Sequence, residues 1–189
     1  MTARGCAEDV AAAASWMLAH GAEHGGDPRR LFIVGHSAGA HLVALVGVDP
    51  AYLGAHGRRP DELAGVIPVD GAGYDALKQM AAPPLPGRLG ARLSDMYRQA
   101  FSAEPAALSP TRLVKPGRAY PPYLIFYVER RQDAREQSEA LGSALAAAGG
   151  RATVVAAPGE THMSINRDFG LAGDREGERA AAFIRTGAL

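Results

Sequence analysis

Cysteine is almost absent from this sequence, because Cys6 is the only one among 189 residues. A single cysteine can form neither an internal disulfide framework nor a zinc site built from several thiolates. Long apolar runs are also missing, since no segment approaches the roughly 18 residues of a transmembrane helix. Glu8 and Asp9 interrupt the Ala-rich N-terminus, which lacks the basic segment that opens a secretory signal. We therefore expect a cytoplasmic protein with no membrane association.

An excess of charge of either sign is lacking as well. The 20 basic and 20 acidic side chains give a formal net charge of zero, and no stretch concentrates Lys or Arg into a basic stripe. This balance argues against nucleic acid as a partner. Hydrophobic residues make up 47% of the chain and charged residues 21%, which is typical of a globular protein. At this length we expect one domain, residues 1–189, with a sizeable core.

Short apolar segments alternate with helical ones, which predicts an α/β protein with a mainly parallel sheet of about four strands flanked by helices. The expected strands are 31–34, 66–69, 123–128 and 153–157, and the expected helices are 7–20, 40–48, 89–101, 133–148 and 175–184. Asp133 and Glu136 have capping-box spacing at the start of their helix. Prolines crowd residues 72–118, so we expect an irregular insertion there, either a lid-like substrate wall or a packed surface loop.

One motif carries chemistry. Residues 35–39, Gly-His-Ser-Ala-Gly, lie between an apolar strand and a helix, which is the strand–turn–helix setting of a nucleophile elbow. The motif predicts Ser37 as a nucleophile and the N–H of Ala38 as an oxyanion-hole donor at the positive end of the helix. We expect a Cβ at Gly35 or Gly39 to collide with a neighbouring element. The alternative is a glycine-rich turn with an idle serine.

A serine nucleophile needs a base, and in proteins with this elbow the base follows the last strand. Of the six histidines, only His162 has that position; the alternative is a histidine of a surface loop. We expect His36 to point away from the nucleophile and His41 to pack inside its helix. The others are expected at loops or helix ends exposed to solvent: His20, His24 and His56.

Five segments resemble the α/β-hydrolase esterases related to arylformamidase (kynurenine formamidase) and bacterial carboxylesterases: residues 35–42, 65–75, 108–117, 121–141 and 159–170. The resemblance covers nearly the whole chain. It implies hydrolysis of a carboxylic ester or aryl-formyl amide through an acyl-enzyme, with Ser37 as nucleophile and His162 as base. The expected partner is thus a small-molecule ester or amide. The sequence shows no metal-ligand cluster or phosphate-binding loop, so we predict no cofactor and no metal.

The acid of the triad stays open at this point. The family usually places an Asp about seven residues before Gln137, where this chain has Arg130, and an arginine cannot orient a histidine or stabilise an imidazolium. Three carboxylates are near enough to substitute. Asp133 ranks first, although it also suits a helix N-cap; Glu129 ranks second, although it should face the other way. Asp70 ranks third, because it ends the second strand, where some hydrolases carry their acid.

The resemblance also implies a partial sheet. In this fold the elbow follows the fifth of eight strands, whereas here only one helix precedes Ser37. We therefore expect the four strands to be the C-terminal half of the usual sheet, without the N-terminal strands and their His-Gly-Gly loop. Strand 31–34 would then be an unpaired edge, covered by a partner or used for homo-oligomers. The alternative function is a catalytically impaired or truncated hydrolase-fold protein that acts as a binding or self-associating module.

Overall fold

Four parallel strands form one sheet in the order β1-β2-β3-β4. The computed structural model describes residues 2–81, 87–101 and 104–188. The strands are β1 (Phe32–His36), β2 (Gly65–Val69), β3 (Tyr123–Val128) and β4 (Ala152–Ala157). All four expected strands are confirmed, with ends that differ by two residues at most. Neighbours in sequence are also neighbours in the sheet, so each connection crosses over to the adjacent parallel strand.

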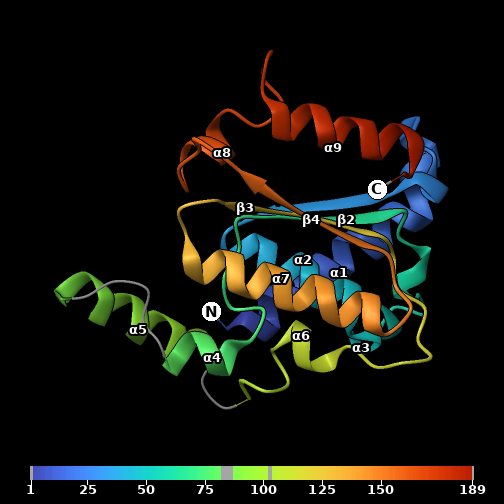
Figure 1. The fold of residues 1–189 in the computed structure, drawn as a ribbon. Helices are drawn as coiled ribbons and strands as arrows, with labels where there is room; N and C mark the ends of the chain where they lie inside the picture. Colours follow the sequence, from blue (N-terminus) through green and yellow to red (C-terminus); the bar gives the residue numbers. More distant parts are fainter. Residues whose placement is uncertain (1, 82–86, 102–103, 189) are drawn as a thin grey trace.

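Helices cover both faces of the sheet (Figure 1). The helices α1 (Ala3–His20), α2 (Ala38–Val48) and α7 (Gln132–Ala147) lie on one side, and α9 (Arg175–Thr186) lies on the other. Shorter elements complete the connections: the helices α3 (Pro50–Gly54) and α8 (Ser164–Arg167), and the 3₁₀ turns η1 (Gly21–His24), η2 (Pro28–Arg30) and η3 (Pro60–Glu62). None of the described helices combines the length and the hydropathy needed to cross a membrane.

Two hydrophobic cores follow from the alternation of side chains along each strand. On β3, Tyr123 and Ile125 belong to the core under α1, α2 and α7, whereas Leu124 and Phe126 belong to the core under α9 with Phe183. A strand buried on both faces must be apolar at every position. This explains why residues Tyr123–Val128 form one continuous apolar run in the sequence.

Three helices occupy much of the segment 72–118, where the sequence predicts an irregular insertion with one helix. They are α4 (Ala76–Ala81), α5 (Gly87–Phe101) and α6 (Pro110–Leu113), and α5 projects from the body of the molecule (Figure 1). Phe101, at the end of α5, is buried and packs its ring against His41, with ring centroids 5.0 Å apart. Ser109 joins the two ends of the segment, because its Oγ accepts from the N–H of Ala76 at 2.9 Å.

The predicted capping box at the start of α7 is wrong. The helix begins at Gln132, and the cap residue Arg131 makes no side-chain capping bond. Both predicted members pair with cations instead: Asp133 with Arg131 at 2.9 Å, and Glu136 with Lys78 at 2.6 Å. Asp133 still stands in the first turn, where its charge complements the helix dipole.

The packing of α2 on the sheet yields a stability prediction at Gly47. A Cβ there would overlap the hydroxyl of Tyr123, which donates to the carbonyl oxygen of Ala44 at 3.1 Å. Gly47→Ala should therefore destabilise the protein by about 1–3 kcal/mol, although alanine is the better helix former. The control is Gly5→Ala in α1, where the nearest atom lies at 3.5 Å and a gain of about 0.5–1 kcal/mol is expected. Urea unfolding measures the free energy of unfolding of both variants. An equal gain in stability for Gly47→Ala and Gly5→Ala would show that α2 can move away from β3.

Candidate active site

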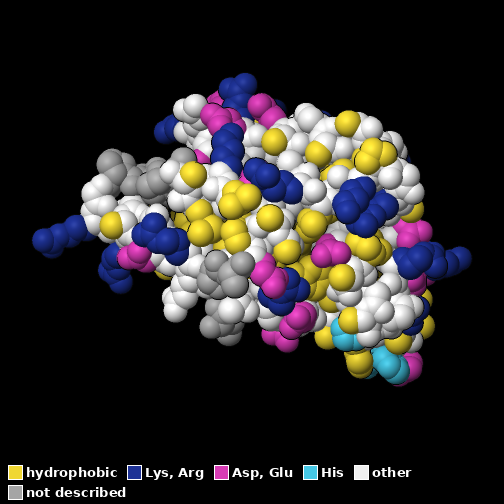
Figure 2. All heavy atoms as spheres, turned by 90° about the horizontal axis from the view of Figure 1, so that it is seen from below, with side chains coloured by type: hydrophobic (Ala, Val, Ile, Leu, Met, Phe, Trp, Pro, Cys, Tyr) yellow, Lys and Arg dark blue, Asp and Glu magenta, His cyan; other side chains and the backbone are white. Residues whose placement is uncertain are grey.

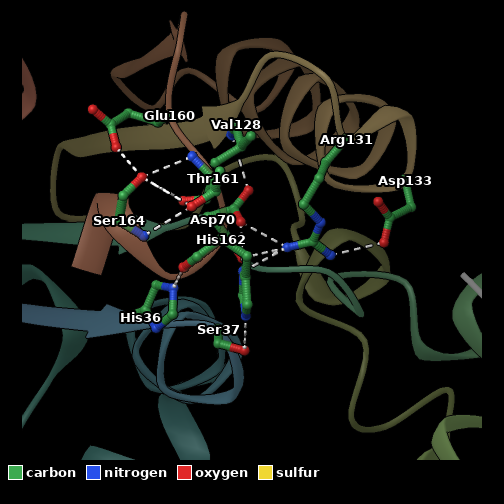
Figure 3. A network of polar contacts seen from close by, with 10 residues as sticks. All are labelled: His36, Ser37, Asp70, Val128, Arg131, Asp133, Glu160, Thr161, His162 and Ser164. Carbon is green, nitrogen blue, oxygen red and sulfur yellow. Dashed lines mark hydrogen bonds and ion pairs between the residues drawn. The ribbon is translucent and has the colours of Figure 1, made fainter. Parts of the chain in front are cut away.

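The candidate residues come from the carboxyl ends of all four strands. Ser37 follows β1, Asp70 follows β2, Arg131 stands in the loop after β3, and His162 follows β4. Because the strands are parallel, these ends meet at one edge of the sheet. Residues far apart in the sequence therefore form one polar network there (Figure 3).

Ser37 lies at a sharp turn between β1 and α2. Its backbone has φ 58° and ψ −117°, a conformation that costs energy for a residue with a side chain. The turn is held by the N–H of Ser37, which donates to the carbonyl oxygen of Val69 at 3.0 Å. The expectation for Gly35 is confirmed, since a Cβ there would overlap the carbonyl group of Gly39. For Gly39 the expectation is wrong, because a Cβ there would meet open space.

His162 lies between Ser37 and Asp70. Its Nε2 is 3.0 Å from the Oγ of Ser37, and its Nδ1 is 2.6 Å from the Oδ2 of Asp70. A carboxylate can only accept, so the short contact to Asp70 requires the proton on Nδ1. Nε2 is then free to accept the hydroxyl proton of Ser37. The three side chains have the connectivity of a nucleophile, a base and an orienting acid.

The structure corrects the ranking of the acids. Asp133, ranked first from the sequence, does not contact His162, and its Oδ2 accepts from Nη2 of Arg131 at 2.9 Å. Glu129, ranked second, is exposed to solvent. Asp70, ranked third, is the carboxylate at the imidazole. The physical reason is that Asp70 directly follows β2, the neighbour of the strand that carries Ser37, whereas Asp133 is already inside α7.

The carboxylate of Asp70 is fully buried and is surrounded by donors. Its Oδ1 accepts from the N–H of Val128 at 2.9 Å, and its Oδ2 accepts from Nη1 of Arg131 at 2.7 Å as well as from His162. Burial alone would raise the pKa of Asp70, but the hydrogen bonds from His162 and Val128 and the charge of Arg131 hold this pKa below its ordinary value. Asp70 is therefore ionised at neutral pH.

Arg131 is the site residue that the sequence analysis missed. Its Nη1 also lies 3.2 Å from the carbonyl oxygen of Asp70 and 2.9 Å from Nδ1 of His162. The neighbouring Arg130, by contrast, is exposed at the edge of the cavity. No feature of the sequence separates these two adjacent arginines, because only the path of the loop after β3 decides which of them turns inward.

The loop that carries His162 is braced by its own polar side chains (Figure 3). The N–H of Thr161 donates to Oγ of Ser164 at 2.8 Å, and the N–H of Ser164 donates to Oγ1 of Thr161 at 3.1 Å. The hydroxyl of Ser164 also donates to Glu160. These bonds close a tight turn around His162 and fix the imidazole relative to the sheet.

Two other histidines lie close to the site. His36 packs against His162: its Nε2–H donates to the carbonyl oxygen of His162 at 2.8 Å, and the two rings lie 4.5 Å apart. That its ring points away from Ser37 stays a prediction. Burial and the neighbouring His162 lower the pKa of His36. His41 is buried, as expected; its Nδ1–H donates to Gly73, and burial lowers its pKa to about 4. Both rings are therefore neutral at neutral pH.

A metal ion does not suit this cluster. His36, Asp70 and His162 offer ligand atoms within 4.8 Å of one another. However, Nε2 of His36 and Nδ1 of His162 both carry protons that are donated in hydrogen bonds, and the guanidinium of Arg131 occupies the open side of Asp70. A cation would have to displace these donors and the fixed charge. The donor set thus fits a hydrogen-bonded chain that ends at Ser37.

Ala38 provides a backbone N–H at the N-terminus of α2, and its role as an oxyanion-hole donor stays a prediction. It is the first residue of the 11-residue helix α2, so its N–H has no acceptor within the helix. Ala38 directly follows Ser37 in the chain, so its N–H belongs to the positive end of the helix dipole. A negative charge that develops on an atom bonded to Oγ would be stabilised there.

A cavity of about 1000 Å³ opens in front of Ser37 and His162. One wall is the apolar stripe of α5, formed by Leu93, Met96, Tyr97, Ala100 and Phe101, and the start of α1 forms another with Thr2, Ala3 and Cys6. Seen from below the view of Figure 1, hydrophobic side chains are exposed between the projecting α5 and the body of the molecule (Figure 2). A second hollow of about 420 Å³ lies between β4 and α9, away from Ser37.

The fold and the site define a member of the α/β hydrolase family. The family model described as alpha/beta hydrolase fold matches residues 3–166, so the chain belongs to this family. A search of the curated proteins found no match.

The similar solved structures are esterases. A butyrate-bound esterase of the planctomycete Thermogutta terrifontis has 25% identity and a TM-score of 0.70, over 98% of this chain and 66% of that one. The same esterase phosphonylated by sarin gives 25% identity and a TM-score of 0.71, over 97% and 66%. Esterase B of Lactobacillus rhamnosis shares the fold at 21% identity and a TM-score of 0.71, over 98% and 61%. The chain thus spans slightly less than two thirds of these esterases, and its four-stranded sheet is a partial α/β-hydrolase fold.

The contacts of His162 predict which carboxylate supports it. Asp70→Asn should lower kcat for p-nitrophenyl acetate about ten-thousandfold, because an amide stabilises the wrong imidazole tautomer. Asp133→Asn should cost less than about tenfold, since its carboxylate pairs with Arg131 and not with His162. Steady-state kinetics measure both, with Glu129→Gln on the exposed strand end as the control. A large loss for Asp133→Asn beside a small one for Asp70→Asn would restore the ranking made from the sequence.

Proposed function

We propose that this chain is a serine hydrolase that cleaves carboxylic esters through an acyl-enzyme. The observation that carries the proposal is the continuous chain of contacts from Oγ of Ser37 through the imidazole of His162 to the buried carboxylate of Asp70, at 3.0 and 2.6 Å. Membership of the α/β hydrolase family and the similarity to esterases support it.

The proposed reaction uses these groups in a fixed order. Oγ of Ser37 attacks the carbonyl carbon of the substrate while Nε2 of His162 takes the hydroxyl proton. Asp70 stabilises the imidazolium, and the N–H of Ala38 donates to the oxyanion of the tetrahedral intermediate. The imidazolium then protonates the departing alcohol, which leaves the acyl group on Ser37. A water molecule, deprotonated by His162, hydrolyses this ester and frees the acid.

The cavity favours a substrate with an apolar body. Its apolar wall is the stripe on α5, and we propose that this described part of the segment 72–118 acts as a substrate wall rather than as a loop that only packs on the surface. Residues 82–86 and 102–103 of the segment lie outside the described residues. Aryl-formyl amides form the second proposed substrate class, because the same attack on a carbonyl carbon expels an arylamine. The resemblance of residues 35–42 and 159–170 to arylformamidases supports this class.

The nucleophile can be tested with a fluorophosphonate probe, which forms a covalent bond to an activated serine. The probe should label the wild-type chain, and Ser37→Ala should abolish the labelling. His162→Ala should lower kcat on p-nitrophenyl esters by several orders of magnitude, as triad deletions do. Ser143→Ala, which removes an exposed hydroxyl on α7, is the matched serine control and should keep the label. Labelling that persists in Ser37→Ala would assign the reactivity to another serine.

A second candidate function is self-association, with or without catalysis. The observation that favours it is the edge of the sheet: among the described residues β1 pairs only with β2, and Val34 is 47% exposed. An edge strand with unpaired backbone groups can pair with the same strand of another molecule. We propose that a second copy of this chain is the partner and that the two β1 strands pair about a two-fold axis.

Size-exclusion chromatography with light scattering tests this association. We expect a mass above that of the 19.7 kDa monomer, and Val34→Lys should shift it toward the monomer, because a charge on an edge strand opposes pairing. The control is Leu171→Lys, which adds the same charge at a residue that is 59% exposed in the loop between α8 and α9. A wild-type chain that stays monomeric at high concentration would reject the proposed pairing.

A further inference from the structure

Arg131 and His162 share one oxygen of the buried carboxylate. Nη1 of Arg131 lies 2.7 Å from Oδ2 of Asp70, and Nδ1 of His162 lies 2.6 Å from the same atom. The proposed triad therefore includes a fixed positive charge on its acid, at the same oxygen that contacts the imidazole. Asp133 holds the other end of the guanidinium through Nη2 at 2.9 Å.

The contacts leave only one consistent arrangement of protons. A guanidinium always donates and never accepts, and Nδ1 carries its proton toward Asp70. The 2.9 Å approach of Nη1 to Nδ1 is thus a contact between two donors. Nη1 directs its protons to Oδ2 and to the carbonyl oxygen of Asp70, at 2.7 and 3.2 Å. These bonds fix the rotation of the carboxylate, which in turn fixes the imidazole.

The charge of Arg131 opposes the charge of Asp70 at the imidazole. Asp70 favours the protonated ring, whereas a cation at this distance favours the neutral ring. The side chains of Asp70 and Arg131 are 0% and 25% exposed, so water screens their interaction with His162 only partly. Only a neutral ring can accept the proton of Ser37. Without Arg131, the buried carboxylate of Asp70 would favour the protonated imidazole, which cannot act as a base. The positive charge of Arg131 counteracts this effect in acidic solution.

We infer that Arg131 is a positioning residue of the proposed hydrolase: anchored by Asp133, it orients Asp70 and keeps His162 available as a base in more acidic solution. This inference rests on the proposed function. Two further titratable groups near the imidazole are His36, which packs against it and has a pKa lowered by burial, and Glu160, which is bound to Ser164. Neither of them contacts Arg131 in the described part of the chain.

The test is the pH profile of kcat/KM for p-nitrophenyl acetate between about pH 5 and 8, measured for three substitutions. Arg131→Met should move the acid limb up by about one pH unit, and Arg131→Gln should do the same while it keeps an uncharged N–H donor. Arg131→Lys keeps the charge and should leave the limb near that of the wild type. A purely structural role would lower kcat at every pH without moving the limb. Thermal melts identify any variant that fails to fold. If Arg131→Met does not fold, the acid limbs of Arg131→Gln and Arg131→Lys are compared instead.

Arg130→Met is the matched control, because it removes the adjacent arginine, which is exposed and lies at the cavity edge. Its acid limb should stay in place. His36→Gln is then introduced into the wild type and into Arg131→Met. The acid limbs of these two variants should still differ by the same amount, because the limb reports His162 and not His36. If the limb of Arg131→Met and of Arg131→Gln coincides with that of the wild type, the inference is overturned.

A second readout separates this inference from the proposed function. The imidazole of His162, assigned with His162→Gln, can be titrated by nitrogen-15 NMR in the wild type and in Arg131→Met, with no substrate present. A midpoint at higher pH in Arg131→Met supports the charge effect even if the chain hydrolyses no ester. Equal midpoints reject it even if Ser37 reacts with the fluorophosphonate probe and the proposed hydrolase activity holds.

Discussion

Parallel pairing of four strands is the constraint on which the candidate site depends. It brings the four carboxyl ends to one edge, where Ser37, Asp70, Arg131 and His162 each stand a few residues after a different strand. The hydrogen-bond ladder continues into the site: the N–H of Ser37 donates to Val69, and the N–H of Asp70 donates to Phe126 at 2.8 Å. The sheet thus sets the positions of the nucleophile and the acid through backbone bonds, and the side chains need only small adjustments.

Burial of Asp70 determines the electrostatics of this edge. A carboxylate without access to water must be fully satisfied by donors, and the chain supplies Val128, Arg131 and His162. Arg131 is itself satisfied by Asp133. Two carboxylates, one guanidinium and one imidazole therefore form a single coupled unit. A change to any one of them alters the charge that the others experience, so effects measured on single variants of this unit will not add.

The sequence was sufficient for the four strands, for the longer helices and for two of the four residues of the candidate site. The strands could be predicted because both faces of each are buried and the apolar runs are unbroken, as in Tyr123–Val128. Ser37 and His162 could be found from the elbow and from chain order. The acid was misranked, because a count along the chain from Gln137 carries no information on which loop residue turns inward. Adjacent residues of one loop, Arg130 and Arg131, differ only in tertiary contacts, and periodicity does not report these.

Backbone strain is concentrated where the chemistry is proposed. Within residues 2–81, 87–101 and 104–188, Ser37 and Asp70 are the two non-glycine residues with positive φ, at 58° and 46°. Each is a single residue between a strand and the segment that follows, and each costs on the order of 1–3 kcal/mol. The backbone bonds to Val69 and Phe126 and the close packing of Gly35 against Gly39 prevent relaxation. Strain at an idle serine would have no function. Here the two strained residues are Ser37 and Asp70, which both contact His162, and the strained backbone fixes their side chains relative to the imidazole. The coincidence of strain, buried charge and hydrogen bonding at this one edge favours a catalytic site over a structural remnant of one.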